Sequence, residues 1–145
     1  KIIPHPVALS AENVHLLHGL DFVFICMDEG RSKREIVALL EAGSASFVDV
    51  GMGVQVGDNN LLGIVRVTTS TPRKRDHFTK CVSFHDAKDD AYSTNIQIAD
   101  LNMLNAALAV IKWKKLRGFY QDMEHEHDST YTINENQLLS EEAQP

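Results

Sequence analysis

The hydrophobic residues of this chain follow patterns that change from one segment to the next. Residues 22–27, FVFICM, are an unbroken apolar run, which is typical of a strand covered on both faces. Residues 31–42 repeat apolar positions with helical spacing and end before a glycine, so they predict a helix. Residues 46–50 are short and valine-rich, and predict a second strand. A strand, a helix and a strand in about 30 residues predict a βαβ unit with parallel strands.

The rest of the pattern predicts a hairpin, a long helix and one more strand. Residues 57–60, GDNN, are a hairpin turn, and residues 61–69 are the run that follows it. Residues 96–116 predict a helix that is apolar almost all round, so we expect it to be buried on more than one side. Residues 81–84 are strand-like, and residues 130–139 predict a strand around an Asn-rich turn.

The chain has 145 residues, of which 43% are hydrophobic. This is enough for one compact domain with one core. We expect residues 1–140 to form that domain and residues 141–145 to be a tail. No apolar segment of the sequence reaches the length that a transmembrane helix needs, so we expect no association with a membrane.

The net charge of −6 and the pI of about 5.6 indicate an acidic surface. Nonspecific binding to nucleic acid needs a basic surface, so we expect no nucleic-acid partner. A small basic island at residues 73–75 is interpreted as a solvated loop. The two cysteines, Cys26 and Cys81, are too few for a disulfide framework and favour a reducing, cytoplasmic location. Cys26 lies in an apolar run and is expected to be an inert core residue.

Asp28 directly follows the first apolar run, where open α/β sheets bind their ligands. The helix begins within three residues, so its N-terminal dipole faces the same crevice. The carboxylate could hold a hydrated Mg²⁺ that bridges phosphates, or it could cap the helix, and spacing alone slightly favours the cap. Lys33 and Arg34 sit unfavourably in the first helical turn and hint at an anionic ligand, although each alone is better explained as a solvated charge.

Gly51, Gly53 and Gly57 resemble the glycine fingerprint (G-x-G) of dinucleotide sites. They join a strand to a hairpin rather than to a helix, so the phosphate-cradle interpretation fails its structural test. We interpret these glycines as places where the backbone packs tightly.

The chain resembles the ThiF/HesA/MoeB-type adenylyltransferases, which are related to ubiquitin-activating enzymes. The resemblance lies in three segments in order: DFVFICMDEGRSKREIVALLEAGSASFVDVGMGV, LLGIVRVTTSTP and NIQIADLNMLNAALAVIKWKKL. It covers nearly the whole chain and corresponds to the C-terminal half of such a domain. The implied fold is α/β, half of a Rossmann-like ubiquitin-activating-enzyme fold, with a mixed sheet, a βαβ unit, a hairpin and a long buried helix.

Members of this family use ATP and Mg²⁺ to adenylate the C-terminal carboxylate of a ubiquitin-like or sulfur-carrier protein. The resemblance implies that Asp28 is catalytic and binds the Mg²⁺ that accompanies the nucleotide. Lys33 falls where the family often has a basic residue, which makes it a second catalytic candidate. Thr68, Thr69 and Thr71 resemble the start of the crossover loop, and are implied to bind the tail of the protein substrate.

The Gly-rich ATP loop, the ribose-binding acid and the catalytic Arg and Lys of the family lie upstream of the matching region. We therefore expect a fragment of a longer enzyme that is inactive alone and binds neither ATP nor Mg²⁺ tightly. Family members are usually dimers, and half a sheet leaves an unpaired edge, so a homodimer is expected. The alternatives are a non-catalytic module for protein binding or dimerisation, and an unrelated α/β domain that binds another nucleotide or acidic ligand.

Overall fold

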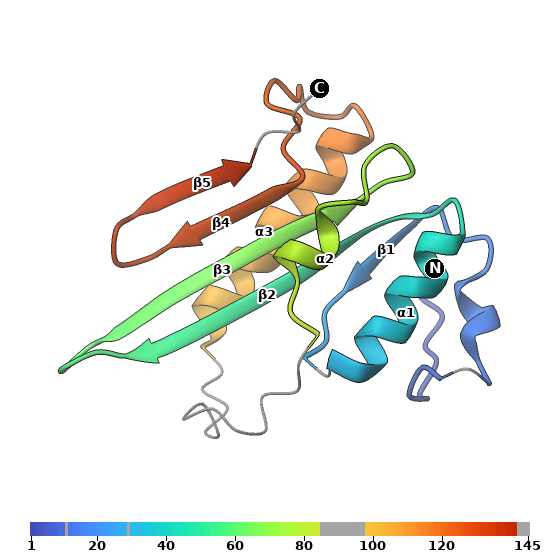
Figure 1. Ribbon diagram of the computed structural model, residues 1–145, viewed down its shortest axis with the longest axis horizontal. Coiled ribbons are helices and arrows are strands. Elements are labelled where there is room, and N and C mark those ends of the chain that lie inside the picture. The colour runs from blue at the N-terminus through green and yellow to red at the C-terminus, as the bar shows by residue number, and fades with distance from the viewer. Residues whose placement is uncertain (11, 29, 85–97, 142–145) are drawn as a thin grey trace.

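The computed structural model describes residues 1–10, 12–28, 30–84 and 98–141. These residues form one five-stranded sheet whose strands lie side by side in chain order (Figure 1). Within this sheet β1 and β2 are parallel, and the other neighbours are antiparallel. A mixed α/β fold is therefore confirmed. The strands are β1 (Phe22–Ile25), β2 (Ser46–Val56), β3 (Leu61–Ser70), β4 (Asp128–Thr132) and β5 (Gln137–Glu141).

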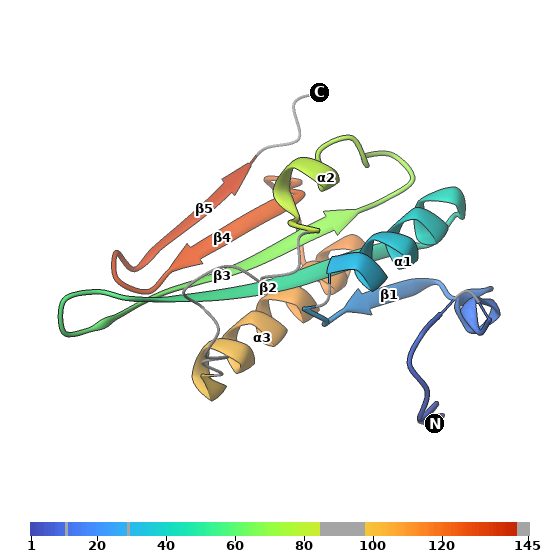
Figure 2. The same ribbon diagram turned by 60° about the horizontal axis from the view of Figure 1, so that its bottom comes forward.

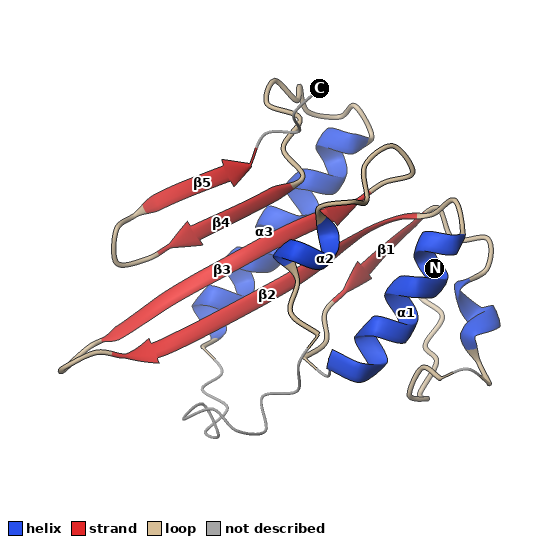
Figure 3. Ribbon diagram, viewed as in Figure 1, coloured by secondary structure: helices blue, strands red, loops and turns tan. Residues whose placement is uncertain are grey.

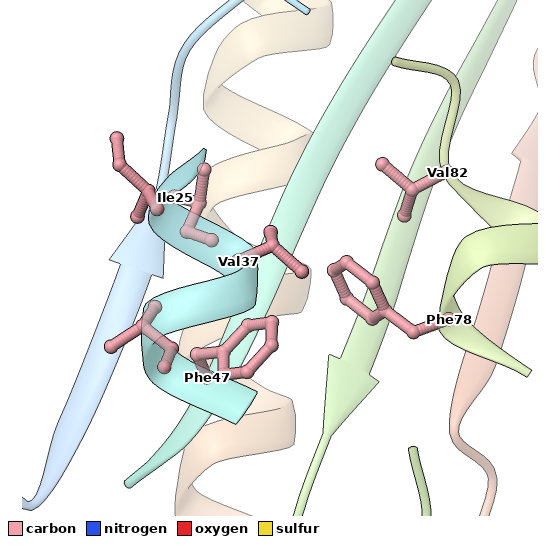
Figure 4. Close-up of a cluster of buried hydrophobic side chains, with 7 residues drawn as sticks. Ile25, Val37, Phe47, Phe78 and Val82 are labelled. Carbon is pink, nitrogen blue, oxygen red and sulfur yellow. The ribbon is translucent and has the colours of Figure 1, made fainter. Parts of the chain in front are cut away.

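The predicted βαβ unit is present. The helix α1 (Gly30–Ala42) connects β1 with β2 and covers one face of the sheet (Figure 3). The apolar residues of α1 recur with helical spacing and therefore lie on one face of the helix, and this face packs against the sheet. Val37 lies near Phe47 of β2 and Phe78 (Figure 4), and the two rings meet edge to face with centroids 5.0 Å apart.

The strands β2 and β3 form the predicted hairpin. The amide N–H of Gly57 donates to the carbonyl oxygen of Asn60 at 2.8 Å and closes the turn. β2 continues well past residue 50, where the sequence pattern predicts its end. Glycine has a low preference for strands, so Gly51 and Gly53 suggest a strand end in the sequence. In the structure, however, both glycines remain paired with residues of β3.

The helix α3 (Ala99–Leu116) covers the opposite face of the sheet (Figure 2). Leu101 and Ala109 are buried against valines of β2 and β3, and Asn105 donates to the carbonyl oxygen of Gly51 at 2.8 Å. The expectation that this helix is buried on more than one side is wrong for the described structure, because its outer side is exposed. Of the helices that the structure describes, none is both long and apolar enough to cross a membrane.

Three further segments differ from the prediction or extend it. Residues 81–84 are not a strand, because the helical turn α2 (Phe78–Cys81) is anchored by the fully buried ring of Phe78. The C-terminal segment makes two strands instead of one, the β4–β5 hairpin, and β5 extends one residue into the predicted tail. Near the N-terminus the chain forms a short 3₁₀ helix, η1 (Val14–Leu17). The predicted helix start at residues 96–97 lies outside the described residues.

Candidate functional site

Asp28 lies where the sequence predicts it, in the connection between the carboxyl end of β1 and the first turn of α1. α1 begins at Gly30, two residues later, so Asp28 precedes the position that caps the helix. Its side chain is exposed. An exposed carboxylate can act as a ligand for a hydrated divalent cation, and the helix N-terminus beside it favours anions such as phosphate.

Lys33 points into the protein instead of toward solvent. Its ammonium Nζ lies 2.9 Å from Oδ1 of Asp49, which is fully buried in β2. The other carboxylate oxygen of Asp49 accepts a hydrogen bond of 2.6 Å from Nη2 of Arg66 in β3. A buried carboxylate needs such partners to offset the loss of its hydration. The structure thus gives Lys33 a structural ion pair, and its catalytic role stays a prediction.

The polar contacts continue across the sheet from Arg66. Its Nη1 donates to the hydroxyl of Thr68, and that hydroxyl donates to Oδ1 of Asp128 in β4. We call the five residues Lys33, Asp49, Arg66, Thr68 and Asp128 the cross-sheet network. The network joins α1 to β2, β3 and β4, and it holds two positive and two negative groups, so the charges balance inside the protein.

Gly51 makes the cross-sheet network possible. A Cβ atom at this position would lie 2.8 Å from Nη2 of Arg66 and 3.3 Å from its Nε. The guanidinium of Arg66 lies across the backbone of β2 because Gly51 has no side chain. Tight packing at Gly51 is therefore confirmed. The group that packs on Gly51 is the guanidinium of Arg66, which also bonds to Asp49.

Of the three threonines assigned to the tail of a protein substrate, two have no exposed surface. Thr68 and Thr69 are fully buried. The backbone of Thr69 is held by His127, whose carbonyl oxygen accepts its N–H at 2.7 Å, and by the ring Nε2 of His77, 2.9 Å from its carbonyl oxygen. Thr71 is half-exposed and exchanges two backbone hydrogen bonds of 3.0 Å with Lys74. Among these threonines, the described structure leaves Thr71 most open to a partner.

The structure does not bring Thr71 and Asp28 together. Phe47, near the start of β2, pairs with Ser70, so Thr71 lies at the amino end of β2. Asp28 follows the carboxyl end of the parallel strand β1, which runs in the opposite direction to β3 (Figure 1). Ile25, the last residue of β1, is level with Asp49 and Thr68, so the chain leaves β1 toward Asp28 in the direction away from Thr71.

The basic island is not a solvated loop throughout. Arg75 donates from Nη1 to the hydroxyl of Ser70 at 3.1 Å and from Nη2 to the carbonyl oxygens of Gly43 and Ala45, each at 3.2 Å. Its guanidinium also lies over the ring of Phe47, 5.6 Å from the centroid. Arg75 therefore supplies hydrogen-bond donors to carbonyl groups just after the C-terminus of α1, where the helix itself provides none.

Neither cysteine is a core residue. Cys26, just after β1, is exposed instead of buried in the strand as predicted. Partial burial of its thiol raises the pKa of Cys26, and the nearby carboxylate of Asp49 adds to this effect while Lys33 opposes it. A raised thiol pKa keeps the less reactive protonated form at neutral pH. Cys81 is half-exposed at the end of α2.

A second charged cluster fixes the chain that follows α3. Lys112 is buried 3.2 Å from Asp122 and 3.5 Å from Glu126, and Lys115 lies 2.8 Å from Glu126. Burial alone would raise the pKa of Asp122, but the charge of Lys112 and its hydrogen bonds outweigh this and lower it. These contacts tie the segment before β4 to the helix, and so they position Asp128 for the cross-sheet network.

The metal-binding capacity of the site is limited to Asp28 as far as the described residues show. No three His, Cys, Asp or Glu side chains gather there in a way that could hold a metal ion. A single exposed carboxylate can contribute to a Mg²⁺ site only where other groups, such as phosphates and water, complete the shell of the ion. No protein-family model and no curated protein matches this chain.

Proposed function

We propose that this chain supplies part of an ATP-dependent adenylyltransferase that activates the C-terminal carboxylate of a ubiquitin-like or sulfur-carrier protein. The observation that carries the proposal is the exposed carboxylate of Asp28 between the end of β1 and the start of α1. This is where open α/β sheets bind ligands, and it is the position that the resemblance assigns to Mg²⁺ and adenylate.

The order of the elements also supports the proposal. The βαβ unit, the β2–β3 hairpin and the long helix α3 follow one another as the three resembling segments require. β1 is parallel and lies at an edge of the described sheet, with the ring of Phe24 partly exposed. Because an edge strand presents unpaired backbone N–H and C=O groups, this edge suits the addition of further strands from the rest of a Rossmann-like domain.

In the proposed reaction Asp28 would hold a magnesium ion, and the dipole at the N-terminus of α1 would favour the phosphates of the nucleotide. The carboxylate of the partner protein would attack the α-phosphorus of ATP, forming the acyl-adenylate as the α–β phosphoanhydride bond breaks and pyrophosphate leaves. Lys33 and Arg66 hold Asp49 in place, and thereby fix α1 against β2 next to the loop that carries Asp28. The tail of the protein substrate would approach Thr71 through its exposed side.

The described residues offer no Gly-rich loop between a parallel strand and a helix. The residues that cradle the phosphates therefore have to come from elsewhere in the assembled enzyme. For this reason we expect weak binding of ATP and Mg²⁺ to this chain alone.

ATP–pyrophosphate exchange tests the proposal. It would be measured with the 145-residue chain and with a version extended upstream in its reading frame by about 100 residues, each with candidate ubiquitin-like proteins. We expect exchange in the extended form, and a loss on the order of a hundredfold in Asp28→Ala because a metal ligand is removed. Asp58→Ala is the matched control, since Asp58 is exposed in the distant hairpin turn.

Two results would contradict the proposal. If exchange survives in Asp28→Ala, Asp28 is not a ligand of the metal ion. The absence of exchange with every carrier would favour the alternative, a non-catalytic module for protein binding or dimerisation.

A further inference from the structure

A groove separates α1 from α2 and residues 82–84, which lie on the same face of the sheet (Figure 1). Its volume is about 640 Å³, within the range of sites that bind small molecules. Val37 of α1 and Val82 line the groove from opposite sides and are buried (Figure 4). Both valines belong to the core beneath α1, so the deepest part of the groove is apolar. Asp28 does not line it, and the groove is therefore separate from the site proposed for the nucleotide.

Two cations line the groove, one on each side. Arg34 belongs to α1 and Lys80 to α2, and both residues are exposed. Within the part of the chain that the structure describes, neither forms an ion pair with a carboxylate. The guanidinium of Arg34 lies over the ring of Phe84, 5.4 Å from the centroid, and this contact holds the charge beside the groove. A guanidinium that is stacked on a ring keeps the N–H groups in its plane available to an anion.

Glu41 limits the charge of the ligand that the groove can accept. It lines the groove seven residues after Arg34, so the two charges are separated by about 10 Å along α1. With Arg34 and Lys80, the lining carries two positive charges and one negative charge. A monoanion neutralises the remaining positive charge, whereas a dianion leaves an excess negative charge beside Glu41. A carboxylate therefore fits the groove better than a phosphate monoester.

We propose that this groove binds a small amphipathic monocarboxylate, with its head group at Arg34 and its apolar body against Val37, Ala38 and Val82. Arginine binds carboxylates through two parallel N–H···O hydrogen bonds, and the apolar body loses contact with water as it enters the groove. The negative charge of Glu41 disfavours the reverse direction of the ligand. A ligand of about ten non-hydrogen atoms with this chemistry should bind with a dissociation constant of about 1 mM or tighter.

The two cysteines provide a local measurement of binding, because Cys81 lines the groove and Cys26 does not. Octanoate is the probe, and mass spectrometry follows the rate at which iodoacetamide alkylates each cysteine of the 145-residue chain at pH 8. Octanoate at 5 mM should slow the alkylation of Cys81 at least about fivefold by mass action and leave that of Cys26 unchanged. Octylammonium has the same chain with the opposite charge and should protect neither cysteine. Octyl phosphate, a dianion at this pH, should bind at least about threefold more weakly than octanoate. No nucleotide is present, so the outcome is independent of the proposed adenylyl transfer.

Two variants test the residues of the groove. Arg34→Gln removes the charge at the head group and should weaken octanoate binding about tenfold. Arg31→Gln is the matched control, since Arg31 is an exposed arginine one turn earlier in α1 and does not line the groove. Ala38→Phe fills the groove and should abolish the protection of Cys81, and urea unfolding shows whether each variant folds.

Five results would each overturn the proposal. They are an unchanged rate for Cys81 in octanoate, equal protection of both cysteines, protection by octylammonium, binding of octyl phosphate as tight as that of octanoate, and protection that persists in folded Arg34→Gln and Ala38→Phe.

Discussion

Replacing Asp49 by asparagine tests whether the cross-sheet network holds the fold together. Asparagine keeps nearly the same shape and removes the charge. In the native protein the two oxygens of Asp49 lie 2.9 Å from Nζ of Lys33 and 2.6 Å from Nη2 of Arg66, and Asp49 is 0% exposed. After the substitution both cations lose the carboxylate that they contact, and Lys33 keeps no ion-pair partner in the cross-sheet network.

The magnitude follows from the burial of the two cations. Removing one partner of a buried ion pair costs about 3–5 kcal/mol, because the remaining charge is left unpaired. The side chain of Lys33 is 7% exposed and has little access to water, whereas that of Arg66 is 19% exposed and can hydrate again. We therefore expect Asp49→Asn to lower the free energy of unfolding by about 3 kcal/mol, toward the lower end of that range. Lys33→Met should cost less, since Arg66 still pairs with Asp49.

Urea unfolding followed by the fluorescence of Trp113, the single tryptophan, measures this change. A loss of about 3 kcal/mol corresponds to a drop of roughly 6–12 °C in the melting temperature for a domain of this size. Asp58→Asn, in the exposed hairpin turn, should leave both values unchanged. A loss below about 1 kcal/mol in Asp49→Asn would refute the reasoning, because hydration would then replace the lost charge more completely than the burial allows.

Three other predictions concern the same fold. Gly51→Ala should destabilise the protein by about 1–3 kcal/mol in urea unfolding, because the new Cβ displaces the guanidinium that lies 2.8 Å away. Gly43→Ala, which meets no atom closer than 3.6 Å, should cost less than 1 kcal/mol. Arg75→Ala should cost about 1–2 kcal/mol through lost donors to backbone carbonyls, while its exposed neighbour Arg73→Ala should be neutral within ~0.5 kcal/mol. Burial lowers the pKa of His127 from its ordinary 6.5, so the unfolded chain binds more protons than the native one. Stability should therefore fall as the pH drops below about 6.5, and His127→Gln should reduce that slope.

Much of the fold could be predicted because the spacing of apolar residues matches the repeat of a strand or of a helix within several segments. The run before Asp28 and the helical spacing of residues 31–42 match β1 and α1 closely. The segment at residues 81–84 was harder, because alternation over four residues is too short to tell a strand from the end of a helical turn. Phe78 decides this segment by packing on Phe47, a contact between residues distant in sequence.

The cross-sheet network could have been found from two signals in the sequence. Lys33 lies three and four residues before Ile36 and Val37, so it shares the buried stripe of α1 instead of facing solvent. Asp49 is a charged residue within an otherwise apolar strand, and such a charge needs a partner. The pairing itself was not predictable, because the register of β2 against β3 decides that Arg66 reaches Asp49.

The two candidate regions show why site prediction was incomplete. The position of Asp28 follows from local chain order, since a loop after a strand and before a helix lies at one end of the sheet. The environment of Thr68 and Thr69 depends on a distant part of the chain, because Thr68 pairs with Asp128 of β4 and the backbone of Thr69 bonds to His127 just before that strand. Sequence spacing holds no information about that neighbour.

The arrangement of strands in chain order also governs how the protein can fold during synthesis. The segment from β1 to the end of β3 at Ser70 can pair as soon as it leaves the ribosome, because its partners are close in sequence. The helix that covers the other face of these strands is complete only at Leu116, about 45 residues later, or several seconds at typical elongation rates. During that interval Val48, Val65 and Val67 face solvent on a nascent sheet. The nascent chain should then be a good substrate for ribosome-associated chaperones, and its demand for them should end once α3 docks.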